Sequence, residues 1–552
     1  MRSSRRTFLS SLATTTAGAC FVRALAAEGS GSAKVTPEMI AKAEWISGLT
    51  LSKEQRKLLV SGADELERAF KALRAVAIDN GISPALVFQP LVPPPPGKAQ
   101  LAVSALPATA RPAKDSDLAF LSVQDLAALI HKKEISSTEL TKFYLARIEK
   151  HDPKLLAVIT RTEELALQQA AQADAEIAKG NWRGPLHGIP YGAKDLLAVP
   201  GYPTTWGAGP YKTQTRPEKA TVVSKLEAAG AVLLAKTTLG ELAMDDEWFG
   251  GTTRNPWKLD QGSSGSSAGS ASCVAAGLMG FAIGSETWGS LVSPSTRCGT
   301  SALRPTFGAV SRYGAMALSW SMDKLGPIAR RVEDLALIHA AIAGADGLDA
   351  AAKDAGFIWR SDLDVRGMRV GVLQDLFDVD YATLAGPGED KQAFREWQKN
   401  DLAALEMLRT LEIGLVPVKL PVTLPVTAMA TILTAEAACA FDELTRSGAD
   451  TGLKRQSEGA WPNLFRQGQL IPAVEYLRAN RVRRMVMQQM ETLMDEYPVL
   501  VAPSFGGDML LLTNLTGHPQ VVVPNGFRSD GTPTKPVHRA LVGRTGLAGA
   551  GA

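Results

Sequence analysis

Apolar residues recur at steps of three and four positions in the first part of the chain. This spacing predicts helices over residues 37–49 and 52–78, and two further amphipathic helices within residues 122–153. Residues 90–115 are rich in Pro and Ala, a composition typical of an extended connector. We therefore expect the main folded part of the chain to begin close to residue 116.

Farther along, helical patterns alternate with short apolar runs bounded by turn residues. Residues 219–230 have the helical spacing, and the apolar run 273–284 suits a buried helix. Strands are predicted at residues 187–199, 231–236, 367–374, 498–504 and 519–527. Because strands and helices interleave, the pattern predicts an α/β domain built on a buried sheet.

The first residues have the layout of an export signal. Arg5 and Arg6 precede a weakly apolar run that reaches to about Val22, and small residues at 24 and 26 offer a cleavage site. A chance arginine pair is the alternative. We expect a twin-arginine signal peptide at residues 1–27, hence a periplasmic or secreted protein whose partners include the twin-arginine export machinery.

These features divide the chain into four expected parts. The signal peptide at 1–27 is followed by a helical N-terminal extension at 28–89, the connector at 90–115 and an α/β domain at 116–552. No segment outside the signal is apolar over the ~18 residues that a membrane span needs. We therefore expect no integral membrane segment in the mature protein.

Composition excludes several classes of partner and cofactor. The chain has 552 residues, with 59 basic and 56 acidic side chains, which gives no reason to expect nucleic acid. Its four cysteines form no C-x-x-C pair, and its six histidines are scattered. We expect no metal and no cofactor; whether the protein forms a homo-oligomer stays open.

The segment 262–290 is rich in Gly and Ser, a composition more often found in linkers than in sites. Its compact apolar middle argues against a linker, because such a run packs into a core. The flanking glycines can expose backbone N–H groups to a ligand, and the serines can act as nucleophile or relay.

Two catalytic interpretations fit this segment. In the first, residues 265–269 match G-x-S-x-G, the nucleophile elbow of α/β-hydrolases, with Ser267 as nucleophile and His339 or His518 as base. The elbow must follow a strand, whereas the preceding residues are polar and turn-like. A five-residue pattern in a Ser/Gly tract also matches easily by chance.

The second interpretation rests on a series of ordered motifs. They include "GPLHGIPYGAKDLL" at 184–197, "SGSSAGSASCVAAGL" at 264–278, "GSETWGS" at 284–290 and "SMDKLGPIARRVEDLAL" at 321–337. Together they resemble the amidase signature family over residues 117–544. The resemblance implies the amidase-signature fold, a large mixed β-sheet covered by helices on both faces.

The resemblance also implies a Ser–cis-Ser–Lys triad. Lys194 of "GAKD" matches the family's lysine, Ser266 its bridging cis serine and Ser290 its nucleophile. The family's spacing of 24 positions between the two serines fits Ser266 with Ser290 and excludes Ser263 and Ser264.

This triad needs an uncharged lysine. A serine hydroxyl is a weak nucleophile until a base takes its proton, so burial must lower the pKa of Lys194. Ser266 would relay the proton between Ser290 and Lys194. The backbone N–H groups of Thr287, Trp288, Gly289 and Ser290 are the candidates to hold the oxyanion.

Three features depart from the family's pattern. Trp288 replaces a residue that is often glycine, which places an aromatic wall at the oxyanion pocket. Val292 stands where many members have arginine. After about residue 535 the sequence runs into small residues, and the family's closing helix is not expected there.

The resemblance implies hydrolysis of a small-molecule carboxylic amide, or an ester, through an acyl-serine intermediate. Two alternatives stay open: the A-type subunit of a tRNA-dependent amidotransferase, which an export signal argues against, and a catalytically inactive binding protein on the same fold. The acyl and amine groups of the substrate cannot be deduced from the sequence.

Overall fold

The computed structural model divides the chain into two compact units, Met1–Asp79 and Asn80–Ala552. It describes residues 35–47, 51–54, 56–57, 59–60, 79–81, 86–90, 100–354, 356–385, 390–457, 459–533 and 539–543. The expected signal peptide and most of the second expected helix lie outside the described residues, so both stay predictions.

In the first unit, helix α3 (Pro37–Ala43) begins where the spacing predicts it. The side chain of Thr36 accepts a hydrogen bond from the backbone N–H of Met39 at 3.2 Å, and Pro37 occupies the first helical position. Both features favour a helix start. The 3-10 helix η1 (Glu44–Ser47) continues it.

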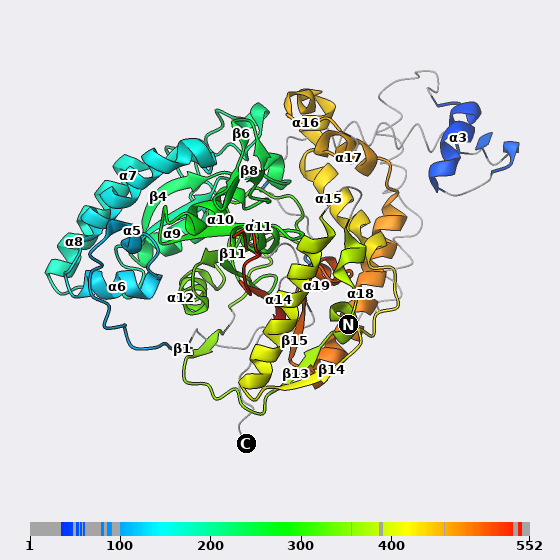
Figure 1. Ribbon diagram of the computed structural model, residues 1–552. Coiled ribbons are helices and arrows are strands. Elements are labelled where there is room, and N and C mark those ends of the chain that lie inside the picture. Colours follow the sequence, from blue (N-terminus) through cyan, green and yellow to red (C-terminus); the bar gives the residue numbers. More distant parts are fainter. Residues whose placement is uncertain are drawn as a thin grey trace, which may run out of the picture. The chain divides into compact units, whose positions relative to one another are not determined.

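The second unit is built on one sheet of 11 strands (Figure 1). In spatial order they are β14 (Gly414–Pro417), β13 (Arg369–Val372), β15 (Val499–Pro503), β17 (Arg539–Gly543), β16 (Gln520–Val523), β10 (Ser301–Arg304), β11 (Lys324–Ala329), β9 (Phe281–Glu286), β3 (Pro190–Lys194), β4 (Val232–Thr237) and β2 (Val158–Arg161). Neighbours are parallel at β3–β4, β3–β9, β13–β14 and β13–β15 and antiparallel elsewhere. The expected mixed sheet is confirmed.

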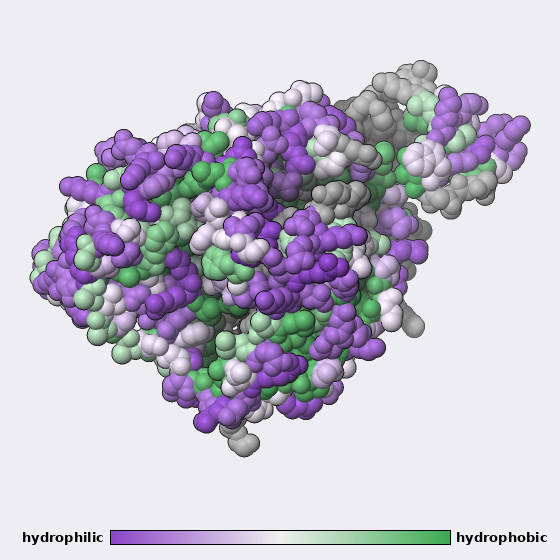
Figure 2. Space-filling view, in the orientation of Figure 1, coloured by the Kyte–Doolittle hydropathy of each residue, from purple (hydrophilic) through white to green (hydrophobic). Residues whose placement is uncertain are grey.

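The helices of this unit pack on strands of the sheet or on one another. They are α5 (Asp115–Leu118), α6 (Val123–His131), α7 (Ser137–Leu155), α8 (Glu163–Ala178), α9 (Thr221–Ala228), α10 (Ala268–Ala275), α11 (Val292–Cys298), α12 (Val332–Ile342), α13 (Gln374–Phe377), α14 (Lys391–Thr410), α15 (Thr431–Ala440), α16 (Asp442–Arg446), α17 (Trp461–Gly468), α18 (Ala473–Glu496) and α19 (Met509–Thr516). Polar side chains dominate the face of the molecule drawn in Figure 2. Of the described helices, none combines the length and the apolar character that crossing a bilayer requires.

The predicted elements are mostly confirmed, with one correction. The strands at β3, β4, β13, β15 and β16 and the helices α6, α7 and α9 fall within their predicted ranges or shift by one or two residues. The apolar run 273–284 is not one helix: α10 ends at Ala275 and β9 begins at Phe281. Gly277 lies between them at φ +65°, in the left-handed region that ends helices and favours glycine.

Part of the expected connector belongs to the second unit. Strand β1 (Gln100–Ala102) pairs in parallel with β12 (Ile358–Arg360), and the hydroxyl of Thr109 donates a hydrogen bond of 2.6 Å to Asp125. Near the C-terminus, β17 lies between β15 and β16 in the main sheet. Residues of the expected connector and residues near the C-terminus therefore both contribute strands to this unit.

Candidate functional site

The three expected catalytic residues lie where the C-terminal ends of two neighbouring strands meet. Lys194 is the last residue of β3, and Ser290 lies in the loop that follows β9. Because β3 and β9 are parallel neighbours, their ends reach the same edge of the sheet. Ser266 precedes α10, and its peptide bond with Gly265 is cis, as the resemblance implies.

Lys194 is fully buried and surrounded by hydroxyl groups. Its side chain is 0% exposed, and Nζ lies 2.8 Å from Oγ of Ser266, 3.1 Å from Oγ of Ser267 and 2.9 Å from Oγ of Ser285. The structure therefore brings the lysine into direct contact with the expected bridging serine. Three hydroxyl partners can satisfy the hydrogen bonds of an amine without a counter-charge.

The surroundings favour the uncharged form of this lysine. Burial lowers the pKa of Lys194 well below its ordinary value, and the negative charges of Asp323 and Glu286 oppose that shift only in part. An uncharged amine has a lone pair that can accept a proton from a hydroxyl. This is the property that a lysine base requires.

Ser290 lies at the edge of this cluster. Its side chain is 9% exposed, and within the described part of the chain its hydroxyl makes no hydrogen bond, including none to Ser266. Its backbone carbonyl accepts a hydrogen bond of 3.1 Å from the N–H of Ser267. The backbone thus ties the two serine-bearing segments together, while the Ser290 hydroxyl stays available.

The loop 287–290 presents unused backbone donors. Among the residues that the structure describes, no acceptor is found for the N–H groups of these four positions. Gly289 has φ +92°, which favours glycine, and Trp288 is 43% exposed. Unpaired N–H groups beside a serine hydroxyl match the donors of an oxyanion hole.

The sequence did not predict the contacts of several polar side chains in this site. The hydroxyl of Ser267 accepts from the N–H of Ser285 at 3.1 Å and lies 3.1 Å from its carbonyl oxygen, so it links α10 to β9. The hydroxyl of Thr287 donates to Asp323 at 2.6 Å. The alternation of side chains along a strand could have placed Ser285 on one face of β9, but not beside a lysine of β3.

The nucleophile-elbow alternative does not form. Ser267 is fully buried with its hydroxyl already bonded, and the strand before it, β8 (Lys258–Gly262), belongs to a separate two-stranded sheet with β7 (Arg254–Asn255). His339, on α12, packs against the ring of Phe357. Nδ1 of His518 bonds the hydroxyl of Thr516. Among the described residues, no hydrogen bond joins either histidine to Ser267.

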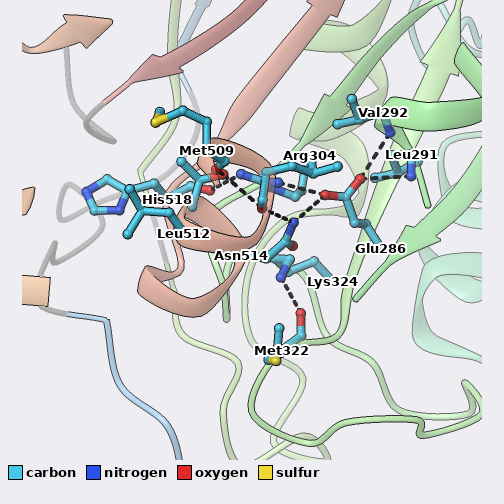
Figure 3. A network of polar contacts seen from close by, with 12 residues as sticks. Glu286, Leu291, Val292, Arg304, Met322, Lys324, Met509, Leu512, Asn514 and His518 are labelled. Carbon is cyan, nitrogen blue, oxygen red and sulfur yellow. Dashed lines mark hydrogen bonds and ion pairs between the residues drawn. The ribbon is translucent and has the colours of Figure 1, made fainter. Parts of the chain in front are cut away.

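A second buried polar cluster, centred on Glu286, joins the two ends of the loop 287–290 (Figure 3). The carboxylate of Glu286 accepts hydrogen bonds from the backbone N–H groups of Leu291 and Val292, from Arg304 at 2.6 Å and from Asn514 at 2.7 Å. Burial raises the pKa of Glu286, but the charge and hydrogen bond of Arg304, with Asn514, outweigh burial and lower it to about 2. Glu286 is therefore a carboxylate at neutral pH.

Comparisons with known proteins agree with this geometry. Residues 139–525 match the Amidase family model. The chain is 34% identical to the A-type subunit of the glutamyl-tRNA(Gln) amidotransferase from Moorella thermoacetica, over 78% of this chain and 94% of that protein. The structure resembles the native peptide amidase from Stenotrophomonas maltophilia at 30% identity and a TM-score of 0.63, over 76% of this chain and 93% of that one.

A bacterial aryl acylamidase of the amidase signature enzymes has a TM-score of 0.62 at 25% identity, over 77% of this chain and 93% of that chain. The solved structures thus include amidases. The curated relatives, in contrast, are named as A subunits of glutamyl-tRNA(Gln) amidotransferases. They therefore support the amidotransferase alternative better than a general amidase. The chain belongs to the amidase signature family and has the fold of an enzyme that acts on carbon–nitrogen bonds.

Proposed function

We propose that this protein cleaves a carboxylic amide through a covalent acyl-Ser290 intermediate, with Lys194 as the base and Ser266 as the proton relay. The observation that supports this assignment best is the fully buried Lys194, whose Nζ lies 2.8 Å from the Ser266 hydroxyl and whose pKa burial lowers well below its ordinary value. An uncharged lysine can accept a proton only from a group that it contacts, and Ser266 is such a group.

The reaction follows from these positions. As Ser290 Oγ attacks the amide carbon, its proton passes to Ser266, and the proton of Ser266 passes to Lys194. The C–N bond then breaks, and the amine leaves with a proton returned along the same path. In the second half, water attacks the acyl carbon and its proton passes to Lys194. The bond between that carbon and Ser290 Oγ then breaks, Ser290 takes the proton back, and the acid is released.

The N–H groups of Thr287, Trp288 and Gly289 are proposed to stabilise the tetrahedral oxyanion. They are unpaired among the described residues, so they can bond the substrate oxygen without first breaking another contact. One such donor typically contributes about 10²- to 10³-fold to kcat. Trp288, exposed at the same loop, forms an aromatic wall beside the scissile bond.

The second candidate is the A-type subunit of a tRNA-dependent amidotransferase, favoured by the curated relatives at 34% identity. Both candidates require the release of an amide nitrogen, so they share the chemistry proposed for Ser290. They differ in the fate of the nitrogen, which leaves as free ammonia or amine in one and passes to a glutamyl-tRNA in the other. The proposed export of the chain, which rests on Arg5 and Arg6, favours a free-standing amidase.

A fluorophosphonate probe tests the assignment of the nucleophile. Peptide mass spectrometry should place the adduct on Ser290, and Ser290→Ala should lose labelling and hydrolysis together. Ser293→Ala is a matched control, because the Ser293 hydroxyl bonds Ser264 and not the catalytic lysine. This variant should be labelled like the wild type. An adduct on Ser267 would contradict the assignment.

A second assay separates the two candidate functions. The purified chain is given small aryl, aliphatic and peptide amides, and released ammonia or amine is measured without any other protein. Turnover by the chain alone supports a free-standing amidase. Labelling of Ser290 without turnover, together with activity only when glutamyl-tRNA and the other amidotransferase components are added, supports the second candidate.

A further inference from the structure

The loop 287–290, called the oxyanion loop from here on, is spanned by the side chain of the residue that precedes it. The carboxylate of Glu286, the last residue of β9, reaches across five positions and accepts from the backbone N–H of Leu291 at 2.8 Å and of Val292 at 3.0 Å. These N–H groups belong to the start of α11, where an anion is favoured. Residues 287–290 are thereby held in a tight turn between β9 and α11.

The carboxylate is held from its other side as well. Oε1 of Glu286 accepts from Nη1 of Arg304 and from Nδ2 of Asn514, and the same Nδ2 bonds the carbonyl oxygen of Leu510 at 2.9 Å (Figure 3). The side chain of Leu510 approaches Gly289 so closely that a Cβ added there would lie 2.9 Å from it. Helix α19 thus supports both the carboxylate and the loop.

The balancing charge for Glu286 is that of Arg304. Lys324 lies opposite Glu286 on the paired strand β11, but burial and the charge of Arg304 lower the pKa of Lys324 well below its ordinary value. Arg304 and Glu286 are both 0% exposed in their side chains. A buried carboxylate with four donors has one strongly preferred position.

The other end of the loop is held by a second buried carboxylate. Asp323 accepts from the hydroxyl of Thr287 at 2.6 Å and from the backbone N–H groups of Leu318 and Ser319 at 2.8 and 2.9 Å. The loop is therefore fixed at both ends through its first residue and the two residues after its last one. The N–H groups in between are the ones left without an acceptor among the described residues.

We infer that Glu286 is a positioning residue for the oxyanion hole, an inference that rests on the proposed function of Ser290. By accepting the N–H groups of residues 291 and 292, it fixes the turn in which the N–H groups of 287–290 stay unpaired next to the nucleophile. Its contribution is made only when an oxyanion forms. Loss of Glu286 should therefore affect the transition state more than the binding of intact substrate.

The variant Glu286→Gln tests this inference. An amide cannot accept at both of its terminal atoms, so either the backbone N–H groups of Leu291 and Val292 or the side chains of Arg304 and Asn514 lose their acceptor. We expect kcat to fall by about 100-fold with KM nearly unchanged. Affinity for a boronic acid that forms a tetrahedral adduct on Ser290 should fall by a similar factor, whereas affinity for the product acid should not.

Asp334→Asn is a matched control. Asp334 is a buried carboxylate that accepts from the first backbone N–H groups of another helix, those of Val123 and Gln124 at 3.1 and 3.3 Å. It lies outside the oxyanion loop. This variant should lower the midpoint of urea unfolding while leaving kcat and boronic acid affinity within about two-fold of wild type.

The variant Asn514→Leu keeps the inference testable if Glu286→Gln does not fold. It removes one of the four donors that hold the Glu286 carboxylate and should lower kcat and boronic acid affinity together by about 10-fold. Folded Glu286→Gln, or Asn514→Leu in its place, with wild-type kcat and boronic acid affinity would overturn the inference. Wild-type protein that shows neither turnover nor Ser290 labelling would instead contradict the proposed function.

Discussion

Replacing Lys194 by methionine separates the role of this lysine as a base from its effect on stability. The side chain is fully buried, and its pKa in the folded protein lies well below the ordinary value of 10.5. Between those two pKa values, the unfolded chain binds one proton more than the folded chain at this position. The free energy of unfolding of the wild type therefore rises with pH in that range, and Lys194→Met should remove this part of the rise.

The magnitude follows from linkage. Each pH unit in this range adds about 1.4 kcal/mol to the wild type's free energy of unfolding relative to that of Lys194→Met. The difference should grow as pH rises toward 10.5 and stop growing above it. Methionine also leaves the hydroxyls of Ser266, Ser267 and Ser285 without their amine partner, at about 1 kcal/mol each, but that cost does not depend on pH.

Urea unfolding at a series of pH values measures this difference. The buried Lys236 and Lys324 are present in both proteins, so their contributions cancel. The exposed Lys142, replaced by methionine, is the control and should give a difference that stays constant with pH. If the difference in free energy of unfolding between wild type and Lys194→Met does not change with pH either, Lys194 keeps its proton in the folded protein. That result would refute its role as a base. We also expect Lys194→Met to be inactive.

The remaining predictions concern rate, loop geometry and export. Turnover should rise with pH over the range in which Lys194 loses its proton. Turnover that falls as pH rises through that range would contradict a lysine base. Gly289→Ala places a Cβ at φ +92° and 2.9 Å from a leucine side chain, so kcat should fall by about 10-fold or more, as measured with an amide that the wild type hydrolyses. Arg5 and Arg6, which lie outside the described residues, should both be needed for export; cell fractionation of the double lysine variant should find precursor in the cytoplasm, and normal export would refute the signal.

Much of the fold could be predicted from apolar spacing alone. The run at 231–236 predicts a buried strand because its residues are apolar on both faces, and β4 (Val232–Thr237) is fully buried. The run at 273–284 misled the prediction, because a short apolar segment fits a buried helix as well as a strand. The turn at Gly277 decided the matter, and it depends on backbone conformation that composition does not reveal.

The sequence by itself determined the family and the order of its motifs, because ordered motifs can be recognised along a chain without its fold, and the resemblance to that family predicted Lys194, Ser266 and Ser290 as the site residues. Tertiary structure decided everything that depends on strands meeting in space. The contact of Lys194 with Ser285 joins β3 to β9, and the contact of Glu286 with Asn514 joins β9 to α19, 228 positions later. The pKa of a buried group is likewise set by all the dipoles and charges that the fold brings around it, and no local stretch of sequence contains them.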